Sequence, residues 1–335
     1  MISNAEFLFK EFTHNHIDSF FLLPQSGSDR KNYIGITNNK KYIITENNNI
    51  EENKSFFYFS DVFQKLKLNT PKILKISENQ TTYIQEFLGD KTLFEIIKTE
   101  GESQRVKNLV QLSLKKLFDL QTKTKGKIDF SNTFEYEAYD EIPIMHDLFY
   151  FKFMFVDILD IHYHKSKLIK EFYTLSDFIK NISPKGIMIR DFQSRNILVN
   201  NNDIYFIDYQ SAMNGVLLYD VISFLYQNSI NFSDSFKEEM LDFYYNLWSD
   251  NNIRQQLKNH LKPILLIRSL QVLGAYGFRG LIQKKEYFIN NIHKGIENLY
   301  KISSNWEQMD NFPELQSIVK KLIAYNKNLI YSFDK

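Results

Sequence analysis

The sequence predicts an α+β fold in which a small antiparallel sheet precedes a larger, mostly helical part. The first observation is a series of short β-branched and aromatic runs before residue 88, separated by polar turn clusters. These expected strands are Phe20–Leu23, Lys31–Ile36, Lys41–Thr45, Ile73–Ile76 and Thr82–Phe87. The second observation is the amphipathic helical spacing of apolar residues from Gln104 onward. We therefore expect an N-terminal lobe over residues 1–88 and a helical C-terminal lobe over residues 89–335.

The expected helices follow from apolar periodicity and from end signals. Residues 4–15 and 51–67 read as helices beside the strands, and the acidic pair that opens the second suits the helix dipole. Gly89-Asp90 is a turn signal, which places the hinge between the lobes at residues 85–90. The remaining expected helices cover residues 92–98, 104–121, 144–170, 220–227, 235–248, 251–274, 278–299 and 312–330.

The segment 188–208 interrupts this helical pattern. Two β-branched and aromatic runs, Ile197–Val199 and Ile204–Ile207, flank a polar turn cluster. That arrangement predicts a β-hairpin. In the register that the turn favours, Asn196 falls nearly opposite Asp208, so both side chains lie at the open end of one hairpin.

Three polar residues of this segment, Asp191, Asn196 and Asp208, have the order and spacing of a phosphotransferase centre. A carboxylate on the loop before the hairpin can accept a hydroxyl proton. An amide oxygen and a second carboxylate can hold magnesium, which prefers hard oxygen ligands. Asp and Asn also form turns by chance, and the hairpin is what favours the chemical interpretation. Arg195, inside the loop, would contact a phosphate or pair with a nearby carboxylate.

Four motifs carry a family resemblance that spans residues 20 to 330. Residues 190–196 read Arg-Asp-Phe-Gln-Ser-Arg-Asn, and residues 206–210 read Phe-Ile-Asp-Tyr-Gln. Residues 218–221 read Leu-Tyr-Asp-Val, and residues 273–281 read Leu-Gly-Ala-Tyr-Gly-Phe-Arg-Gly-Leu. The chain resembles the aminoglycoside phosphotransferase and choline kinase group, which has a protein-kinase-like two-lobe fold. Within that group it is most similar to the bacterial anomeric sugar kinases, which phosphorylate N-acetylmuramate and N-acetylglucosamine in cell-wall recycling.

The resemblance implies an ATP- and Mg²⁺-dependent enzyme, with Asp191 as catalytic base and Asn196 and Asp208 as metal ligands. Asp220 would support the catalytic loop by hydrogen-bonding its backbone, and its alternative role is helix N-capping.

Two further residues would serve the acceptor under the same resemblance. Asp147 lies where the related sugar kinases place acceptor-binding groups, and Arg279 lies in the region that lines the acceptor cleft. For both, a solvated or buried structural role is the alternative.

The nucleotide would contact the polar loop between the first two strands and the hinge. Gly27 and Ser28 would present backbone N–H groups to the phosphates, although a plain turn explains the same residues. Arg30 and Lys31, beside this loop, would add positive charge. At the hinge, the backbone around Glu86 and Leu88 would hydrogen-bond adenine.

Two positions depart from the family pattern. Ile189 stands where such catalytic loops usually carry His, and the third strand ends without the lysine that clamps nucleotide phosphates. Arg30 or Lys31 would then supply the missing charge, with Glu52 orienting the cation. Solvent exposure of both cations is the alternative.

Composition is that of an ordinary soluble enzyme. Basic and acidic residues nearly balance, 41 against 40, so no global field favours nucleic acid or an anionic membrane as a partner. The absence of cysteine excludes disulfides and thiolate chemistry. No signal peptide or apolar run of membrane-spanning length is present, which leads us to expect a cytoplasmic protein.

We therefore expect a small-molecule kinase. Asp208 precedes Tyr209 rather than the Phe-Gly of protein kinases, and only 12 positions separate it from Asp220, which leaves no room for an activation segment. The expected acceptor is the anomeric hydroxyl of N-acetylmuramate or N-acetylglucosamine. Aminoglycosides and choline-like alcohols are the alternative acceptors, for which Asp140, Glu141 and Asp147 could line an acidic cleft. The alternative class is a nucleotide-binding pseudokinase.

Overall fold

The computed structural model describes residues 3–24 and 30–333. The chain divides into two compact units, each built from two stretches of sequence. Unit 1 comprises Met1–Glu137 and Gly186–Asn214, and unit 2 comprises Ala138–Lys185 and Gly215–Lys335. The hairpin predicted to carry the site therefore belongs to the unit that contains the N-terminal sheet. The expected lobe boundary near residue 88 remains a prediction.

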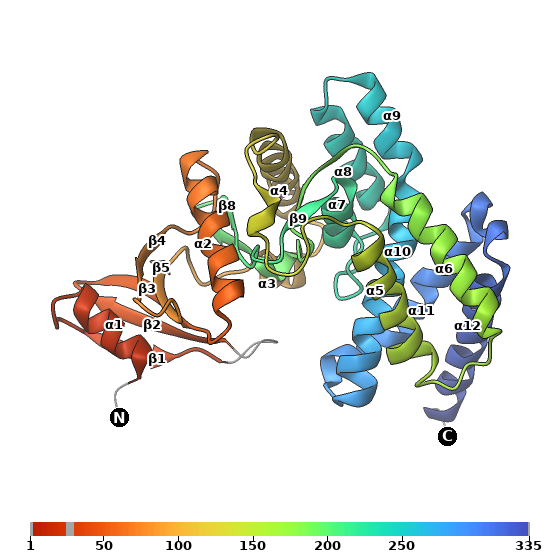
Figure 1. Ribbon diagram of the computed structural model, residues 1–335, viewed down its shortest axis with the longest axis horizontal. Helices are drawn as coiled ribbons and strands as arrows, with labels where there is room; N and C mark the ends of the chain where they lie inside the picture. Colours follow the sequence, from red (N-terminus) through yellow and green to blue (C-terminus); the bar gives the residue numbers. More distant parts are fainter. Residues whose placement is uncertain (1–2, 25–29, 334–335) are drawn as a thin grey trace. The chain divides into compact units, whose positions relative to one another are not determined.

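The predicted five-stranded antiparallel sheet is confirmed, with strand order β1-β2-β3-β5-β4. Its strands are β1 (Ser19–Leu22), β2 (Lys31–Thr37), β3 (Lys40–Glu46), β4 (Ile73–Ile76) and β5 (Thr82–Glu86). Helix α1 (Asn4–Phe12), three residues shorter than expected, covers one face of this sheet (Figure 1). Its Phe9 packs there against Ile44 and Ile84 at the centre of a buried cluster, which anchors the helix to β3 and β5.

Helix α2 (Ile50–Lys65) brings an aromatic stripe to unit 1. The Asn49 side chain caps its N-terminus by accepting from the Glu52 backbone N–H at 3.2 Å. Phe56 and Phe63 pack on the fully buried ring of Tyr209, at centroid distances of 5.0 and 5.1 Å. Burial raises the pKa of Tyr209, which stays a neutral hydrogen-bonding group. Because Tyr209 follows Asp208, this packing fixes the backbone beside a predicted metal ligand.

The predicted hairpin is also confirmed, as β7 (Ile197–Asn200) paired with β8 (Asp203–Phe206). Val199 pairs with Ile204, as the turn chemistry requires. Unit 1 is completed by α3 (Leu93–Glu100), α4 (Gln104–Lys123) and the 3₁₀ turns η1 (Phe130–Asn132) and η3 (Ser194–Asn196). Strands β6 (Lys185–Met188) and β9 (Met213–Val216) form a separate two-stranded sheet.

Unit 2 is helical in the part of the chain that the structure describes. Its α-helices are α5 (Glu141–Phe151), α6 (Lys165–Lys180), α7 (Leu218–Leu225), α8 (Asp234–Leu247), α9 (Asn251–Asn259), α10 (Leu261–Tyr276), α11 (Glu286–Ser304) and α12 (Pro313–Phe333). The other helical segments are two π-helical turns, η2 (Lys152–Val156) and η4 (Gly277–Ile282), and the 3₁₀ turn η5 (Glu307–Asn311). No described helix has both the length and the apolarity that a membrane span requires.

The expected single helix over residues 144–170 is wrong. The chain leaves the α-helix at Phe151, makes the π turn η2, and re-enters a helix only at Lys165. Asp157 fixes the connection by accepting hydrogen bonds from Lys152 Nζ at 2.8 Å and from Tyr163 Oη at 2.6 Å. Asp160 then takes a left-handed backbone conformation, φ 53°, which no helix interior tolerates. Since no proline or glycine marks this break, residue type alone did not show it.

The two π turns of unit 2 contact each other through glycine. A Cβ on Gly277 would lie 1.8 Å from the Met154 carbonyl oxygen, and one on Gly274 would lie 2.8 Å from the Phe151 backbone N. Only glycine permits so close an approach of two backbones. The resemblance motif at residues 273–281 is therefore explained in part by packing of α10 and η4 against α5 and η2.

We expect Gly277→Ala to lower the free energy of unfolding by about 3 kcal/mol or more, because the new methyl group meets main chain that cannot rotate away. Chemical denaturation measures the change. Gly280→Ala is the matched control, since its Cβ would lie 3.2 Å from its nearest neighbour, the Ile289 backbone N, and should cost less. Equal stability of the two variants would contradict the close approach.

Candidate active site

The open end of the hairpin brings two of the three predicted residues into direct contact. Asn196 Nδ2 donates to Asp208 Oδ2 at 3.2 Å and to the Asp191 carbonyl oxygen at 2.9 Å. The Ile207 N–H closes the pair by donating to the Asn196 carbonyl at 3.0 Å. The Asp191 side chain itself is exposed on the loop that enters the hairpin. One amide thus links the proposed base loop to the proposed metal carboxylate.

Asp208 is held in an unusual conformation by three donors. Its Oδ1 accepts from Gln210 Nε2 at 3.0 Å and from Arg30 Nη1 at 3.3 Å, and its Oδ2 accepts from Asn196. Its backbone φ of 65° lies in the left-handed region, which is uncommon for a residue with a side chain. Such conformations persist where the surroundings enforce them and are frequent at functional sites.

Arg30 is the one of the two candidate phosphate-binding cations that lies beside Asp208. Its guanidinium forms an ion pair with Glu52, in the first turn of α2, while also contacting Asp208. Both partners of the Arg30–Glu52 pair are largely buried, with side chains 16% and 17% exposed. Burial alone would lower the pKa of Arg30, but the charges of Asp208 and Glu52 raise it, so the cation is permanent. Arg30 Nε remains without a partner among the described residues.

Lys31 does not join this cluster. It is exposed at the start of β2, opposite Glu46 in the strand register. The described part of β3 has lysines only at its beginning, Lys40 and Lys41, as the sequence indicated. Gly27 and Ser28, predicted to lie over the phosphates, are outside the described residues.

Two asparagines to which the sequence assigned no role at the site, Asn47 in the expected turn and Asn53 in the first turn of α2, support Glu52. Asn47 Nδ2 donates to Glu52 Oε2 at 2.8 Å and to Asn53 Oδ1 at 2.9 Å. Asn53 in turn donates to the Asn47 and Gln80 carbonyls, at 2.9 and 2.8 Å. The side chains of Asn47, Asn53 and Glu52 thus form one hydrogen-bonded network. This network holds the Glu52 carboxylate beside Arg30. The only available signal was the Asn-rich stretch at 47–49, which reads as a turn.

The donor set fits magnesium with a nucleotide better than a metal held by protein alone. Among the described residues, no three His, Cys, Asp or Glu side chains gather to hold a metal ion. Asn196 donates its amide N–H groups to Asp191 and Asp208, so its Oδ1 is the atom that could ligate a cation at the hairpin. Two oxygen ligands suffice for magnesium when water and phosphates complete its shell. Gln210 Oε1, buried and unpartnered among the described residues, is a further oxygen at this place.

The residues predicted to form the hinge lie at the end of β5, and their role as a hinge stays a prediction. Strand β5 ends at Glu86, whose N–H donates to the Lys72 carbonyl at 3.0 Å and whose Oε2 accepts from the Lys72 N–H at 3.1 Å. The Glu86 N–H is therefore already hydrogen-bonded within the protein and is not free to bind adenine. Leu88 is half-buried just beyond the strand. Adenine binding by this backbone stays a prediction.

In unit 2, the two predicted acceptor residues both influence Tyr150 through their charges. Burial raises its pKa, which Arg279 lowers and Asp147 raises through their charges, so both lie within electrostatic range of its hydroxyl. Asp147, however, is fully buried and accepts from Tyr139 Oη at 2.9 Å. Arg279 is half-buried on η4 and stacks over Phe288 at 5.4 Å. The acceptor role of both stays a prediction.

The predicted roles of Asp220 in supporting the catalytic loop and of Arg195 in contacting a phosphate also stay predictions. Asp220 is completely buried in α7, but that helix begins at Leu218 and has Leu217 at its N-cap, so the N-capping explanation of Asp220 is wrong. Arg195 is exposed within the turn η3 and has interaction partners.

Comparisons with known proteins support this interpretation of the hairpin. Residues 164–251 match the model of a family described as "Phosphotransferase enzyme family", and this stretch contains Asp191, Asn196 and Asp208. The comparison with curated proteins finds no significant match.

Solved structures of small-molecule kinases share the fold. Choline kinase LicA from Streptococcus pneumoniae superimposes with a TM-score of 0.60 at 13% identity, over 89% of this chain and 100% of that one. An ethanolamine kinase from Plasmodium vivax superimposes with a TM-score of 0.58 at 17% identity, over 85% of this chain and 82% of that one. The ADP-bound aminoglycoside phosphotransferase APH(2'')-Ib superimposes with a TM-score of 0.59 at 14% identity, over 90% of this chain and 99% of that one.

The protein-kinase-like α+β fold that the sequence predicted is thus confirmed. The chain is therefore similar to the phosphotransferase enzyme family over residues 164–251 and shares its fold with choline, ethanolamine and aminoglycoside kinases.

Proposed function

We propose that the protein transfers the γ-phosphoryl group of ATP to a hydroxyl of an amino sugar, with magnesium as cofactor. The observation that carries the proposal is the cluster at the hairpin, where Asn196, Asp208 and the Arg30–Glu52 pair meet within one compact unit. A metal-binding oxygen set beside a fixed cation is what phosphoryl transfer requires.

ATP would supply the phosphoryl group, and magnesium bound with it would neutralise the negative charge that develops on this group during transfer. Asp191 orients the acceptor hydroxyl and takes its proton. Asn196 and Asp208 would hold the metal through their side-chain oxygens, while Asn196 also fixes the Asp191 backbone. Arg30, held by Glu52, would turn its guanidinium toward a phosphate oxygen.

The choice of an uncharged or anionic acceptor rests on the state of three acidic residues in unit 2. Asp140 caps α5 by accepting from the Ile142 N–H at 3.0 Å, and Glu141 pairs with Lys180 at 3.2 Å. Asp147 is buried against Tyr139. Each carboxylate that could have bound a cationic acceptor has a structural partner, whereas Arg279 has no ion-pair partner among the described residues. A sugar carrying a carboxylate, such as N-acetylmuramate, suits this balance of charge.

The second candidate is a choline or aminoglycoside kinase. It is favoured by the solved structures of similar fold, which include a choline kinase and several aminoglycoside phosphotransferases. A pseudokinase would also carry this fold. It would have little use for Asp191, Asn196 and Asp208 together, although the chain has Ile189 in place of the usual loop histidine.

The test is magnesium-dependent ADP release from ATP with a panel of acceptors: N-acetylmuramate, N-acetylglucosamine, other hexoses, kanamycin and choline. We expect turnover with an N-acetylated amino sugar and none with choline. Turnover with kanamycin or choline alone would replace the proposed acceptor class. Magnesium-dependent ATP binding without turnover on any acceptor would favour the pseudokinase.

A further inference from the structure

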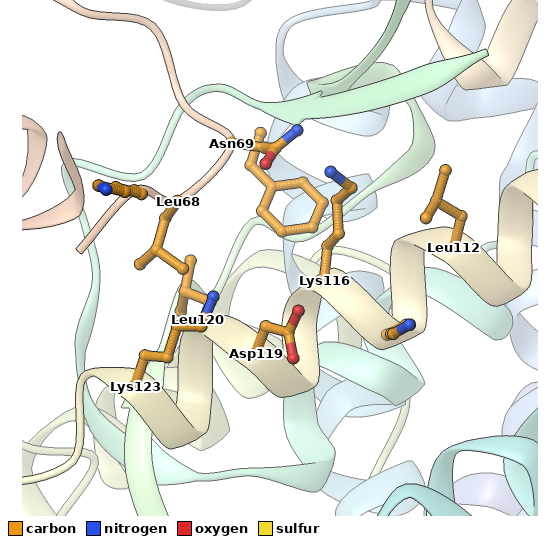
Figure 2. Close-up of a pocket in the computed structure, with 10 residues that line it drawn as sticks. Leu68, Asn69, Leu112, Lys116, Asp119, Leu120 and Lys123 are labelled. Carbon is orange, nitrogen blue, oxygen red and sulfur yellow. The ribbon is translucent and has the colours of Figure 1, made fainter.

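A second polar site lies in unit 1, beside β8. It is a pocket of about 230 Å³ between the segment that follows α2, the second half of α4 and β8 (Figure 2). Its lining is Lys67, Leu68, Asn69, Leu112, Lys115, Lys116, Asp119, Leu120, Lys123 and Phe206. None of these residues belongs to the candidate active site, so the chemistry proposed above leaves the pocket unexplained.

One of its lysines has a structural role. Lys116 Nζ forms an ion pair with Asp203 at 2.7 Å, and Asn69 donates to the same carboxylate at 2.9 Å. Although burial raises the pKa of Asp203, these contacts lower it overall, so the carboxylate stays ionised. This network ties α4 and the α2–β4 connection to the first residue of β8 and gives the pocket a rigid wall.

The other three lysines, Lys67, Lys115 and Lys123, are unpaired. In the part of the chain that the structure describes, no ion pair joins any of them to Asp119 or to another carboxylate. The dipole of α4 explains Lys123, which lies in the last turn. It does not explain Lys115 in the middle of the helix. Three free ammonium groups against one carboxylate give the pocket a positive charge that its own residues do not neutralise.

The remaining lining is apolar. Leu120 and Phe206 are almost completely buried, and Leu112 and Leu68 are half-buried at the wall. Figure 2 shows Lys116 and Lys123 along α4 with Asp119 between them, and Asn69 and Leu68 on the facing segment. A ligand here would meet cations at the mouth and hydrocarbon below, and the volume is below the range of drug-sized sites, about 300–1,000 Å³.

We propose that this pocket binds a small organic phosphate with a flat apolar body, held by Lys67, Lys115 and Lys123. Lysine binds phosphate as a mobile point charge, so three such side chains around one mouth can adapt to a single dianion. The proposal does not rest on the phosphotransferase function, because no residue of the candidate active site takes part.

The probe is pyridoxal 5′-phosphate, a flat phosphate ester whose aldehyde forms an imine with a nearby lysine. Borohydride fixes the imine, and peptide mass spectrometry locates it on the full chain. We expect saturable labelling of Lys67, Lys115 or Lys123, about tenfold above the exposed Lys125 and Lys127, which corresponds to ~1.4 kcal/mol of preferential binding. Inorganic pyrophosphate should suppress this labelling, and sodium chloride at equal ionic strength should not.

Matched variants decide whether the lysines act together. Lys115→Gln with Lys123→Gln should remove most labelling of Lys67, whereas Lys125→Gln with Lys127→Gln removes the same charge outside the pocket and should leave it intact. All four side chains are exposed, so stability should change little. Uniform, non-saturating labelling, or labelling of Lys67 that survives loss of Lys115 and Lys123, would overturn the proposal whether or not the chain has kinase activity.

Discussion

Asp191→Asn is expected to lower kcat by about 10²–10⁴-fold, the usual contribution of a general base. The asparagine has the same size but cannot take the proton of the acceptor hydroxyl. Its backbone carbonyl remains, so the hydrogen bond from Asn196 to residue 191 is kept and the loop should hold its place. The measurement is the rate of ADP release at saturating ATP, magnesium and acceptor.

The control for this variant is Asp61→Asn, which changes an exposed carboxylate on α2 that pairs with Lys65. It should leave kcat unchanged. Nucleotide binding, followed as the magnesium-dependent rise in Tm with ATP, should survive in both variants. If Asp191→Asn turns over at the rate of the unaltered chain, Asp191 takes no part in the chemistry.

Arg30→Gln is expected to lower kcat/KM for ATP by about 10²–10³-fold, the cost of removing one fixed donor from a developing charge. It also leaves the largely buried Glu52 without its cation, at a cost of about 1–3 kcal/mol in the free energy of unfolding. Steady-state kinetics in ATP and chemical denaturation separate the two effects. The kinetic loss must be read at a temperature where the variant is fully folded.

Three further variants sharpen this test. Lys31→Gln removes the neighbouring exposed cation and should have little effect on either measurement. Arg30→Lys keeps the charge but loses the planar fork that contacts Glu52 and Asp208 together, so an intermediate rate is expected. Glu52→Gln should weaken ATP use less than Arg30→Gln. Equal effects of Arg30→Gln and Lys31→Gln would remove Arg30 from phosphate binding.

Much of the local structure could be predicted because its signals are local. The strands carry β-branched runs between turn residues, and the hairpin register follows from its polar turn, so Val199 pairs with Ile204 as expected. The spacing of Asn196 and Asp208 then fixes their proximity without any long-range information. The sequence also determined the absence of cysteine chemistry and the near-neutral charge.

Only the tertiary structure decided which cation faces the site. Arg30 and Lys31 are neighbours with the same charge, yet Arg30 is largely buried in ion pairs whereas Lys31 is exposed at the start of β2. Arg30 meets a carboxylate from α2 and another from the hairpin, residues 22 and 178 positions away. Pairings at such separations depend on how the elements pack, and no local pattern encodes them.

Contacts between distant residues also explain the other features that the sequence did not reveal. The break after Phe151 depends on Asp157 finding Lys152 and Tyr163, and on two glycines of α10 and η4 that admit the π turn η2. Only the structure shows that Asp147 accepts a hydrogen bond from Tyr139 and that Glu141 pairs with Lys180, while the predicted acceptor role of these acidic residues stays a prediction. Residue type and spacing set what each group can do. Which partner it meets is decided by burial, because a polar group removed from water must find its hydrogen bonds within the fold.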